Sequence, residues 1–223
     1  LDSGSRKEIK MEPREHLKLL ISRYPVLEPV GEDIYQAYCL MEKCYEQGGK
    51  LLVGGNGGSC ADSEHIVGEL MKGFCKRRPV PGEFAGKLLA ADPERGAELA
   101  AKLQQGLPAI ALTGHNALST AYLNDVDGLL AMAQQLYGYG RKGDVFLGIS
   151  TSGNSANILY AAAAARAMDI PVIALTGKNG GKLAKMADAA IVVPEQETYR
   201  IQELHLPVYH TLCLMLEDHF FAE

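Results

Sequence analysis

The sequence lacks three features that would place it in other classes of protein. Its net charge is −5, so it has no basic excess of the kind that nucleic-acid-binding surfaces need. It has neither a signal peptide nor an apolar run long enough to cross a bilayer. Its five cysteines are odd in number and include no Cys-x-x-Cys pair, which argues against a disulfide framework or a zinc knuckle. We therefore expect a cytoplasmic protein without a nucleic-acid or membrane partner.

The length and composition fit one well-buried domain. The chain has 223 residues, of which 47% are hydrophobic, so it can bury a sizeable core. It opens on Leu1, which is not an initiating residue, and Met11 could serve as the natural start. We therefore expect a leader over residues 1–11, either disordered or not native, followed by a single domain over residues 12–223.

Short apolar runs alternate with helical segments from residue 50 onward. The first run, residues 51–53, ends in glycine and is typical of a buried parallel strand. Further runs lie at residues 109–112, 145–149, 172–175 and 190–193. Strands that alternate with helices predict an α/β fold, a three-layer parallel sheet with helices on both faces, of flavodoxin- or Rossmann-like type.

Helical spacing of apolar residues predicts further helices at both ends of the chain. Residues 12–23 and 33–47 form an N-terminal helical appendage, and a long helix over about residues 199–219 closes the chain. The appendage carries apolar stripes with little sheet left to cover, so we expect these helices to pair with a second copy of the chain.

Residues 74–107 do not fit the strand–helix alternation. They carry three consecutive cations, then Pro79 and Pro81, and then an apparent helix over residues 94–105, so we interpret them as an insertion between the first helix and the second strand. Long loops in compact domains are often functional. We expect a lid or a wall between subunits over the pocket, whose cations attract an anionic substrate; the alternative is a solvated loop.

A first glycine cluster, residues 54–59, lies between the first strand and a helix. Glycine lets the backbone approach a ligand, and the helix N-terminus supplies N–H donors. The spacing does not match the dinucleotide pattern Gly-x-Gly-x-x-Gly, and no Walker lysine follows. The cluster alone is a weak indication of ligand binding.

A second cluster, residues 150–155, follows the strand at 145–149 and precedes a helix. Its sequence, Ser-Thr-Ser-Gly-Asn-Ser, offers four hydroxyls, whereas an ordinary helix cap needs one. Hydroxyls and exposed N–H groups at a helix N-terminus make a cradle for a phosphate monoester. The cluster therefore predicts a phosphate-binding loop.

The run from Gly148 to Asn157 resembles the phosphate loop of sugar-isomerase (SIS) domain proteins, and residues 175–181 resemble the stretch that follows it. Two further segments are similar to phosphoheptose isomerases in particular, and together these similarities cover most of residues 50–217. These segments are Gly55–Ser59 with Asp62, His65 and Glu69, and Arg200–His205 with His210.

The resemblance implies a SIS fold and a ketose–aldose isomerisation of a sugar phosphate through a cis-enediol. The reaction that the resemblance implies converts sedoheptulose 7-phosphate to a D-glycero-heptose 7-phosphate, with Glu69 and His210 as the acid/base pair. It also implies a zinc ion, a cofactor whose ligands would be His65, Glu69, Gln202 and His210. His65 and Glu69, four residues apart, share one helix face, as such a site requires.

The resemblance further implies which residues bind the sugar phosphate and how the chain assembles. Resembling proteins form homotetramers with sites at subunit boundaries. The implied phosphate ligands are Ser59, Ser150, Thr151, Ser152 and Ser155, and the implied contacts to the sugar are Asn56, Asp125 and Gln202.

Two departures from the family pattern leave alternatives open. Tyr199 stands where the family commonly has an acidic residue, and the insertion is absent or much shorter in the relatives. One alternative is a SIS-domain protein that binds a phosphosugar or a partner, such as a replication initiator, without catalysis. Another is a different phosphosugar enzyme, such as an etherase. His115 and His205 are assigned no functional role.

Overall fold

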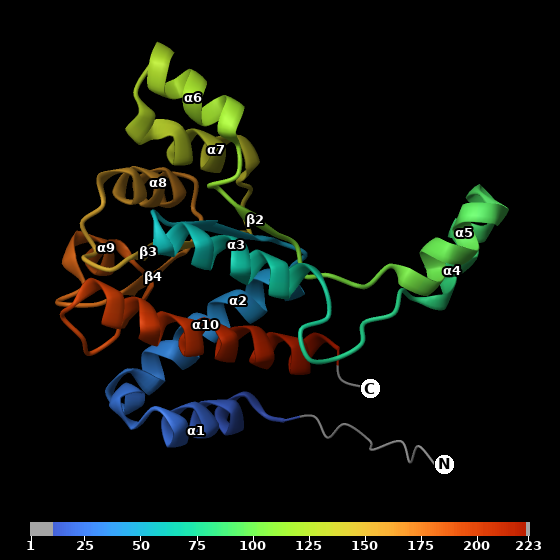
Figure 1. Cartoon of the computed structure of the whole chain (residues 1–223), viewed down its shortest axis with the longest axis horizontal. Helices are drawn as coiled ribbons and strands as arrows, with labels where there is room; N and C mark the ends of the chain where they lie inside the picture. Colours follow the sequence, from blue (N-terminus) through green and yellow to red (C-terminus); the bar gives the residue numbers. More distant parts are fainter. Residues whose placement is uncertain (1–10, 222–223) are drawn as a thin grey trace.

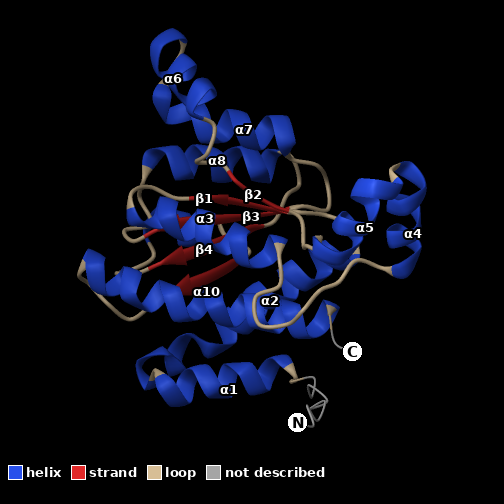
Figure 2. Ribbon diagram, turned by 45° about the vertical axis from the view of Figure 1, so that its right-hand side comes forward, coloured by secondary structure: helices blue, strands red, loops and turns tan. Residues whose placement is uncertain are grey.

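A five-stranded parallel sheet forms the centre of the computed structural model, which describes residues 11–221 (Figures 1 and 2). The strand order is β2-β1-β3-β4-β5, and every pairing is parallel. The strands are β1 (Leu51–Gly54), β2 (Ala109–Ala111), β3 (Val145–Ser150), β4 (Val172–Thr176) and β5 (Ala189–Val192). Except for Met11, the leader predicted over residues 1–11 lies outside the described residues.

Helices cover both faces of the sheet, so the predicted three-layer α/β fold is confirmed. One face carries α2 (Gly31–Glu46), α3 (Gly58–Met71) and α10 (Thr198–Phe220), and the other carries α7 (Ala131–Tyr139), α8 (Ala156–Ala167) and α9 (Gly181–Met186). The remaining elements are α1 (Pro13–Arg23), α4 (Gly82–Ala91), α5 (Pro93–Lys102), α6 (Asn116–Asp125) and two 3-10 helices, η1 (Pro25–Val30) and η2 (Gly128–Leu130).

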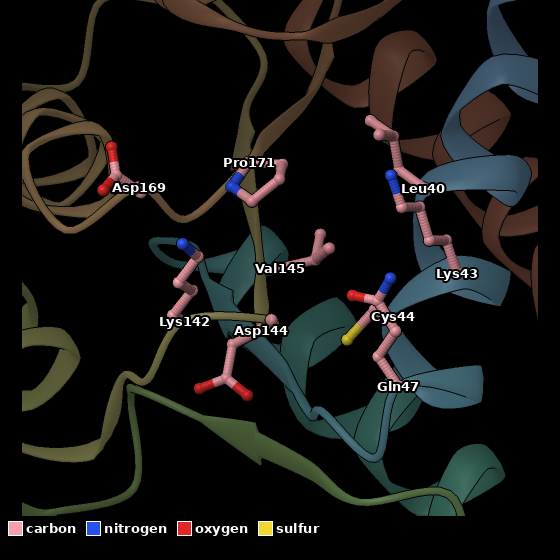
Figure 3. A pocket seen from close by; sticks show the side chains of 10 residues that line it. Leu40, Lys43, Cys44, Gln47, Lys142, Asp144, Val145, Asp169 and Pro171 are labelled. Carbon is pink, nitrogen blue, oxygen red and sulfur yellow. The ribbon is translucent and has the colours of Figure 1, made fainter.

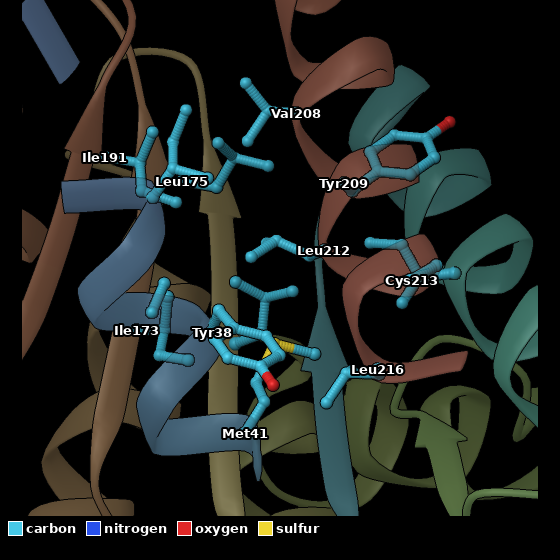
Figure 4. Packing of buried hydrophobic residues seen from close by; sticks show 14 of the residues in the cluster. Tyr38, Met41, Ile173, Leu175, Ile191, Val208, Tyr209, Leu212, Cys213 and Leu216 are labelled. Atoms are coloured by element: carbon cyan, nitrogen blue, oxygen red, sulfur yellow. The ribbon is translucent and has the colours of Figure 1, made fainter. Parts of the chain in front are cut away.

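The alternation of side chains along each strand divides the core in two. Leu51 and Val53 of β1 pack in the cluster with α2, α3 and α10, whereas Leu52 between them packs in the cluster with α7 and α8. This is the two-residue period of a strand that is buried on both faces. Figure 4 shows the first cluster, in which side chains of α2 and α10 meet those of the strands.

The prediction that the N-terminal helices have little sheet left to cover is wrong for one of them, α2. Helix α2 packs beside β5, and its Ile34, Ala37 and Tyr38 are fully buried. Only α1 lies outside this layer, where it packs against α10. Burial of each large apolar side chain in α2 contributes roughly 1.5–3 kcal/mol, so α2 belongs to the body of the domain.

The insertion forms a two-helix arm, α4 and α5, that projects from the body (Figure 1). Its base is closed by a bridge between Pro79 and Gln104, and no residue of α4 is buried. The arm leaves the chain after α3, which runs about 20 Å from the glycine cluster at its start. The arm therefore lies at the other end of α3 from that cluster. No helix in the described part of the chain combines the length and hydropathy needed to cross a bilayer.

A buried histidine joins α10 to the sheet. The His205 side chain is fully buried, and its Nε2 lies 3.2 Å from the Thr176 carbonyl oxygen at the end of β4. Because a carbonyl only accepts, Nε2 carries the proton. Burial lowers the pKa of His205 to about 4, so the imidazole is neutral in the folded protein near neutral pH. This agrees with the absence of a functional role.

His205 should make folding sensitive to mild acid. Its folded-state pKa lies below the ordinary value, so between about pH 6.5 and 4 the unfolded chain binds a proton that the folded chain does not. We expect the free energy of unfolding to fall over this range by up to about 3 kcal/mol more than in His205→Gln. Urea denaturation at a series of pH values measures the difference, and parallel pH profiles for the two proteins would contradict it.

Candidate functional site

Two loops meet where the order of strands along the sheet reverses. The glycine cluster follows β1, the hydroxyl-rich loop follows β3, and these strands are neighbours with β2 on the far side of β1. In open parallel sheets, ligands bind at the carboxyl ends of the strands at such a reversal. The side-chain amides of Asn56 and Asn157 exchange two hydrogen bonds of 2.9 and 2.8 Å and join the two loops there.

The hydroxyl-rich loop does not supply the usual side-chain cap to the helix that follows it. The hydroxyls of Ser150 and Ser155 lie 2.9 Å apart, and Ser152 Oγ accepts from the backbone N–H of Asn154 at 3.2 Å. Ser155 is the N-cap residue of α8, yet its side chain makes no capping hydrogen bond. The first turn of α8 therefore has no N-cap side chain, although the Ile158 N–H donates to Asn157 Oδ1 at 3.1 Å, and its other first N–H groups can donate to an anion.

The turn before α9 packs against this loop and bonds to it. Gly153 has a positive φ of 64°, and a Cβ there would lie 1.9 Å from the Gly180 carbonyl oxygen, so only glycine fits. The Leu183 N–H donates to the Gly153 carbonyl at 2.9 Å, and the Lys182 N–H donates to Asn154 Oδ1 at 3.1 Å. The end of the stretch at residues 175–181, which resembles the family's segment after the phosphate loop, thus holds that loop in one conformation together with Lys182 and Leu183.

The predicted acid/base residues lie together between α3 and α10. His65 Nε2 is 3.1 Å from Glu69 Oε1, and the His65 and His210 rings are edge to face with centroids 5.0 Å apart. Lys72 Nζ lies 3.1 Å from the other oxygen of Glu69. The structure therefore brings together three of the four residues predicted to bind zinc, and both residues predicted to move protons.

The electrostatic setting of His210 suits proton transfer. Burial lowers its pKa, and the nearby His65 lowers it further, while Glu69 acts in the opposite direction. Its Nε2 is buried and has no hydrogen-bond partner among the described residues. A neutral imidazole with an unused ring nitrogen can accept or return a proton near neutral pH.

Tyr209 and Asp62 complete this group, and the sequence analysis gave neither of them a role. The Tyr209 hydroxyl donates to Asp62 Oδ1 at 3.2 Å and lies 3.0 Å from His65 Nδ1, so it orients that ring. Burial raises the pKa of the Asp62 carboxyl. Tyr209 lies seven residues after Gln202, hence on nearly the same side of the closing helix, and this spacing is the signal that could have identified it.

The remaining predicted residues divide between the two loops and the surface. Ser59 is buried in the first turn of α3, and Gln202 reaches Gly58 in the same turn, where a Cβ would lie 2.6 Å from the Gln202 amide nitrogen. Gln202 therefore lies by the glycine cluster, whereas His65 is seven residues, about 10 Å, farther along α3. Asp125 lies exposed at the end of α6, where its carboxylate accepts from Asn124 at 2.7 Å.

The three cations of the insertion are not a free positive surface. Arg78 is buried against Glu217, and Lys76 pairs with Asp218, which also bonds to His16 at 2.6 Å. Only Arg77 of the three is exposed. The expected long-range attraction by three cations is therefore wrong, because two of them neutralise carboxylates of α10.

Two of the cavities among the described elements bear on the location of the site. One, of about 430 Å³ between α1 and α10, is lined by His210, Phe74 and Arg23 among others, so it borders one member of the acid/base pair. The other, of about 350 Å³, lies at the amino ends of β3 and β4 beside Asp144 and Lys142 (Figure 3), away from the two loops.

The residues predicted to hold zinc fit a metal by type but do not form a ready-made cluster. Among residues 11–221, no group of three or more histidine, cysteine, aspartate and glutamate side chains is arranged to hold a metal ion. The donors nevertheless include the unpartnered Nε2 of His210, and a neutral His65 would set the lone pair of Nε2 against Glu69. A proton or a cation would relieve that contact, so the residues fit a metal that binds with some rearrangement.

Comparisons with known proteins agree on one family. The model of the SIS domain matches residues 93–177. A phosphoheptose isomerase from Aneurinibacillus thermoaerophilus is 38% identical over 177 residues, which cover 79% of this chain and 76% of that protein. One from Nitratiruptor is 36% identical over 211 residues, which cover 92% of this chain and 99% of that protein. The solved structure of a phosphoheptose isomerase from Neisseria gonorrhoeae superposes with a TM-score of 0.70 at 35% identity, covering 92% of this chain and 96% of that one.

Proposed function

The chain belongs to the phosphoheptose isomerase family of SIS-domain proteins and is a sugar-phosphate isomerase, and we propose that it converts sedoheptulose 7-phosphate to a D-glycero-heptose 7-phosphate. The observation that carries this proposal is the pairing of an uncapped, hydroxyl-rich loop at the sheet reversal with an unpartnered histidine beside a glutamate. The first can hold a phosphate and the second can move a proton.

We propose that Ser59, Ser150, Thr151, Ser152 and Ser155 hold the phosphate and that Asn56, Gln202 and Asp125 contact the sugar. The hydroxyls and the first N–H groups of α8 supply neutral donors to the dianion, so no lysine is needed in the loop. Asn56 and Gln202 support this assignment, because Asn56 belongs to the glycine cluster and bonds to Asn157 beside the phosphate loop, and Gln202 reaches Gly58 of the same cluster.

In the proposed reaction, Glu69 removes a proton from C1 of the ketose, and the resulting enediol is reprotonated at C2 to give the aldose. His210 moves the proton between the two oxygens, since its Nε2 is unpartnered and its pKa is lowered by burial. His65, which Tyr209 orients, lies beside Glu69 with its Nε2 3.1 Å from Oε1.

We propose that zinc binds at this group, with His65, Glu69, Gln202 and His210 as its ligands. Bound there, the ion would polarise the carbonyl of the sugar. The support for this is the type of donor and the unsatisfied Nε2 of His210. Because Gln202 lies by the glycine cluster, its participation requires movement of that side chain.

We propose that the chain acts as a homo-oligomer, a tetramer, in which the acid/base pair of one copy serves the phosphate loop of another. Glu69 lies eleven residues after Gly58, about 16 Å along α3 from the turn that borders the glycine cluster. The phosphate loop is joined to that cluster and not to the far part of α3. A second copy could bring Glu69 and His210 to the open side of the loop.

A non-catalytic SIS-domain regulator is the second candidate, because sugar-phosphate binding alone would need only the loops. The acid/base group argues against it, since binding does not require an unpartnered buried histidine. A cytoplasmic location remains a prediction from the cysteine content.

Glu69→Gln should abolish turnover while leaving the sugar phosphate bound. The amide keeps the shape of the side chain and cannot accept the proton, so kcat should fall by about 10²- to 10⁴-fold. Aldose formation from sedoheptulose 7-phosphate, followed by NMR, measures kcat, and calorimetry measures binding. The control is Glu64→Gln on the same helix, which should keep wild-type turnover.

Assays with added zinc and with a chelator, together with the zinc content of each protein, test whether the reaction uses bound zinc. Normal turnover in folded Glu69→Gln would favour the non-catalytic candidate.

Mixed oligomers should reveal whether the site is shared between copies. Ser152→Ala with Ser155→Ala impairs the loop, and Glu69→Gln impairs the acid/base pair, so each protein alone should be nearly inactive at low substrate concentration. Co-expression of the two should restore about a quarter of the sites if each site uses two copies. Light scattering gives the size of the assembly. No recovery in a mixed tetramer, or a stable monomer, would contradict the shared site.

A further inference from the structure

A buried ion pair lies at the end of α3, next to the backbone of Glu69. Arg78 and Glu217 are each 1% exposed, and the guanidinium Nη2 lies 2.8 Å from Glu217 Oε1. Burying two charges carries a desolvation cost that their attraction often does not recover, so such a pair is weak evidence of a stabilising role.

Glu217 fixes the segment that follows α3. Its Oε1 accepts from the Phe74 N–H at 2.8 Å, and its Oε2 accepts from the N–H groups of Cys75 and Lys76 at 2.8 and 3.1 Å. Arg78 Nε adds a further bond of 2.9 Å. One carboxylate at the end of α10 thus bonds to four of the five residues 74–78, all except Arg77.

Arg78 connects the same carboxylate to the end of α3. Its Nη1 donates to the Leu70 carbonyl at 2.9 Å, and its Nη2 lies 3.5 Å from the Glu69 carbonyl oxygen. Helix α3 has no basic residue in its last turn, so Arg78 supplies the positive charge that the carbonyls of a helix end favour. The backbone that carries Glu69 is therefore held by Glu217 through Arg78.

Phe74 connects the carboxylate to the other member of the acid/base pair. Its ring packs on the His210 imidazole with centroids 5.3 Å apart, and its N–H is one of the donors to Glu217. Both reactive side chains thus have neighbours whose placement depends on this single buried carboxylate.

We propose that Glu217 is a positioning residue for the isomerase reaction: with Arg78 and Phe74 it sets the relative placement of Glu69 and His210. This inference rests on the proposed function of those two residues. It assigns Glu217 no contact with the substrate. It also separates catalysis from binding, because the phosphate loop is joined to the glycine cluster at the start of α3, whereas the clamp formed by Glu217, Arg78 and Phe74 lies at the end of α3.

Glu217→Gln should lower kcat by about 10- to 100-fold with KM within about twofold of wild type, because small misplacements of reacting groups are costly. The amide sets N–H donors against the N–H groups of Cys75 and Lys76 and removes the charge that Arg78 needs. Kinetics are measured at a temperature where the variant is fully folded. A KM increase with unchanged kcat would overturn the proposal.

Asp144 offers a matched control. It is 2% exposed, its carboxylate pairs with Lys50 Nζ at 2.6 Å, and it accepts backbone N–H groups of Lys50 and Arg141 at 2.9 and 2.7 Å. It lies at the amino end of β3, beside a cavity (Figure 3) that none of His65, Glu69 and His210 lines. Asp144→Asn should lower the melting temperature as Glu217→Gln does, yet leave kcat unchanged. An equal loss of kcat in both variants would show that Glu217 acts only through stability.

Two further measurements keep the test decisive. If Glu217→Gln does not fold, Phe74→Leu leaves the carboxylate network intact and should still lower kcat with little loss of stability; unchanged kcat there would overturn the proposal. Hydrogen exchange of residues 74–76, which needs no turnover, should rise in Glu217→Gln but not in Asp144→Asn. If the wild type fails to isomerise the sugar yet shows this exchange pattern, the proposed function is wrong and the clamp is real; unchanged exchange refutes the clamp itself.

Discussion

The alignment of α10 with α3 is the constraint on which the site depends. The two helices run side by side in the same direction, so successive turns of one meet successive turns of the other. Gln202 meets Gly58, Tyr209 meets Asp62 and His65, and Glu217 meets the end of α3 through Arg78. The bond from His205 to the Thr176 carbonyl fixes this register against the sheet. A shift of one turn, about 5.4 Å, would separate every one of these pairs.

This alignment places phosphate binding at the first turn of α3 and proton transfer at its last turns. The first turn borders the two loops at the sheet reversal, where helix N-termini and hydroxyls favour an anion. The last turns carry His65 and Glu69, which face His210 in a partly buried setting that lowers the pKa of His210. Phosphate recognition and proton transfer therefore depend on separate parts of one helix pair.

Much of this could be predicted from the sequence where the signal is local. The loop at residues 150–155 was identifiable because strand, turn and helix follow one another directly, and His65 with Glu69 because a four-residue spacing fixes a shared helix face. The contact of His210 with them is long-range and came only from family resemblance. Arg78 and Glu217 were missed because a buried charge cannot be told from a solvated one in a sequence, and α4 was missed within the insertion.

The central claim is that the chain moves a proton between adjacent carbons of a sugar phosphate. The most direct measurement is the isomerisation of sedoheptulose 7-phosphate in D₂O, with the position of deuterium in the aldose read by NMR. An enediol protonated by an exchangeable base predicts deuterium at C2 of the product and none in the Glu69→Gln reaction mixture. Aldose that forms without any solvent deuterium at C2, or no aldose at all, would contradict the account.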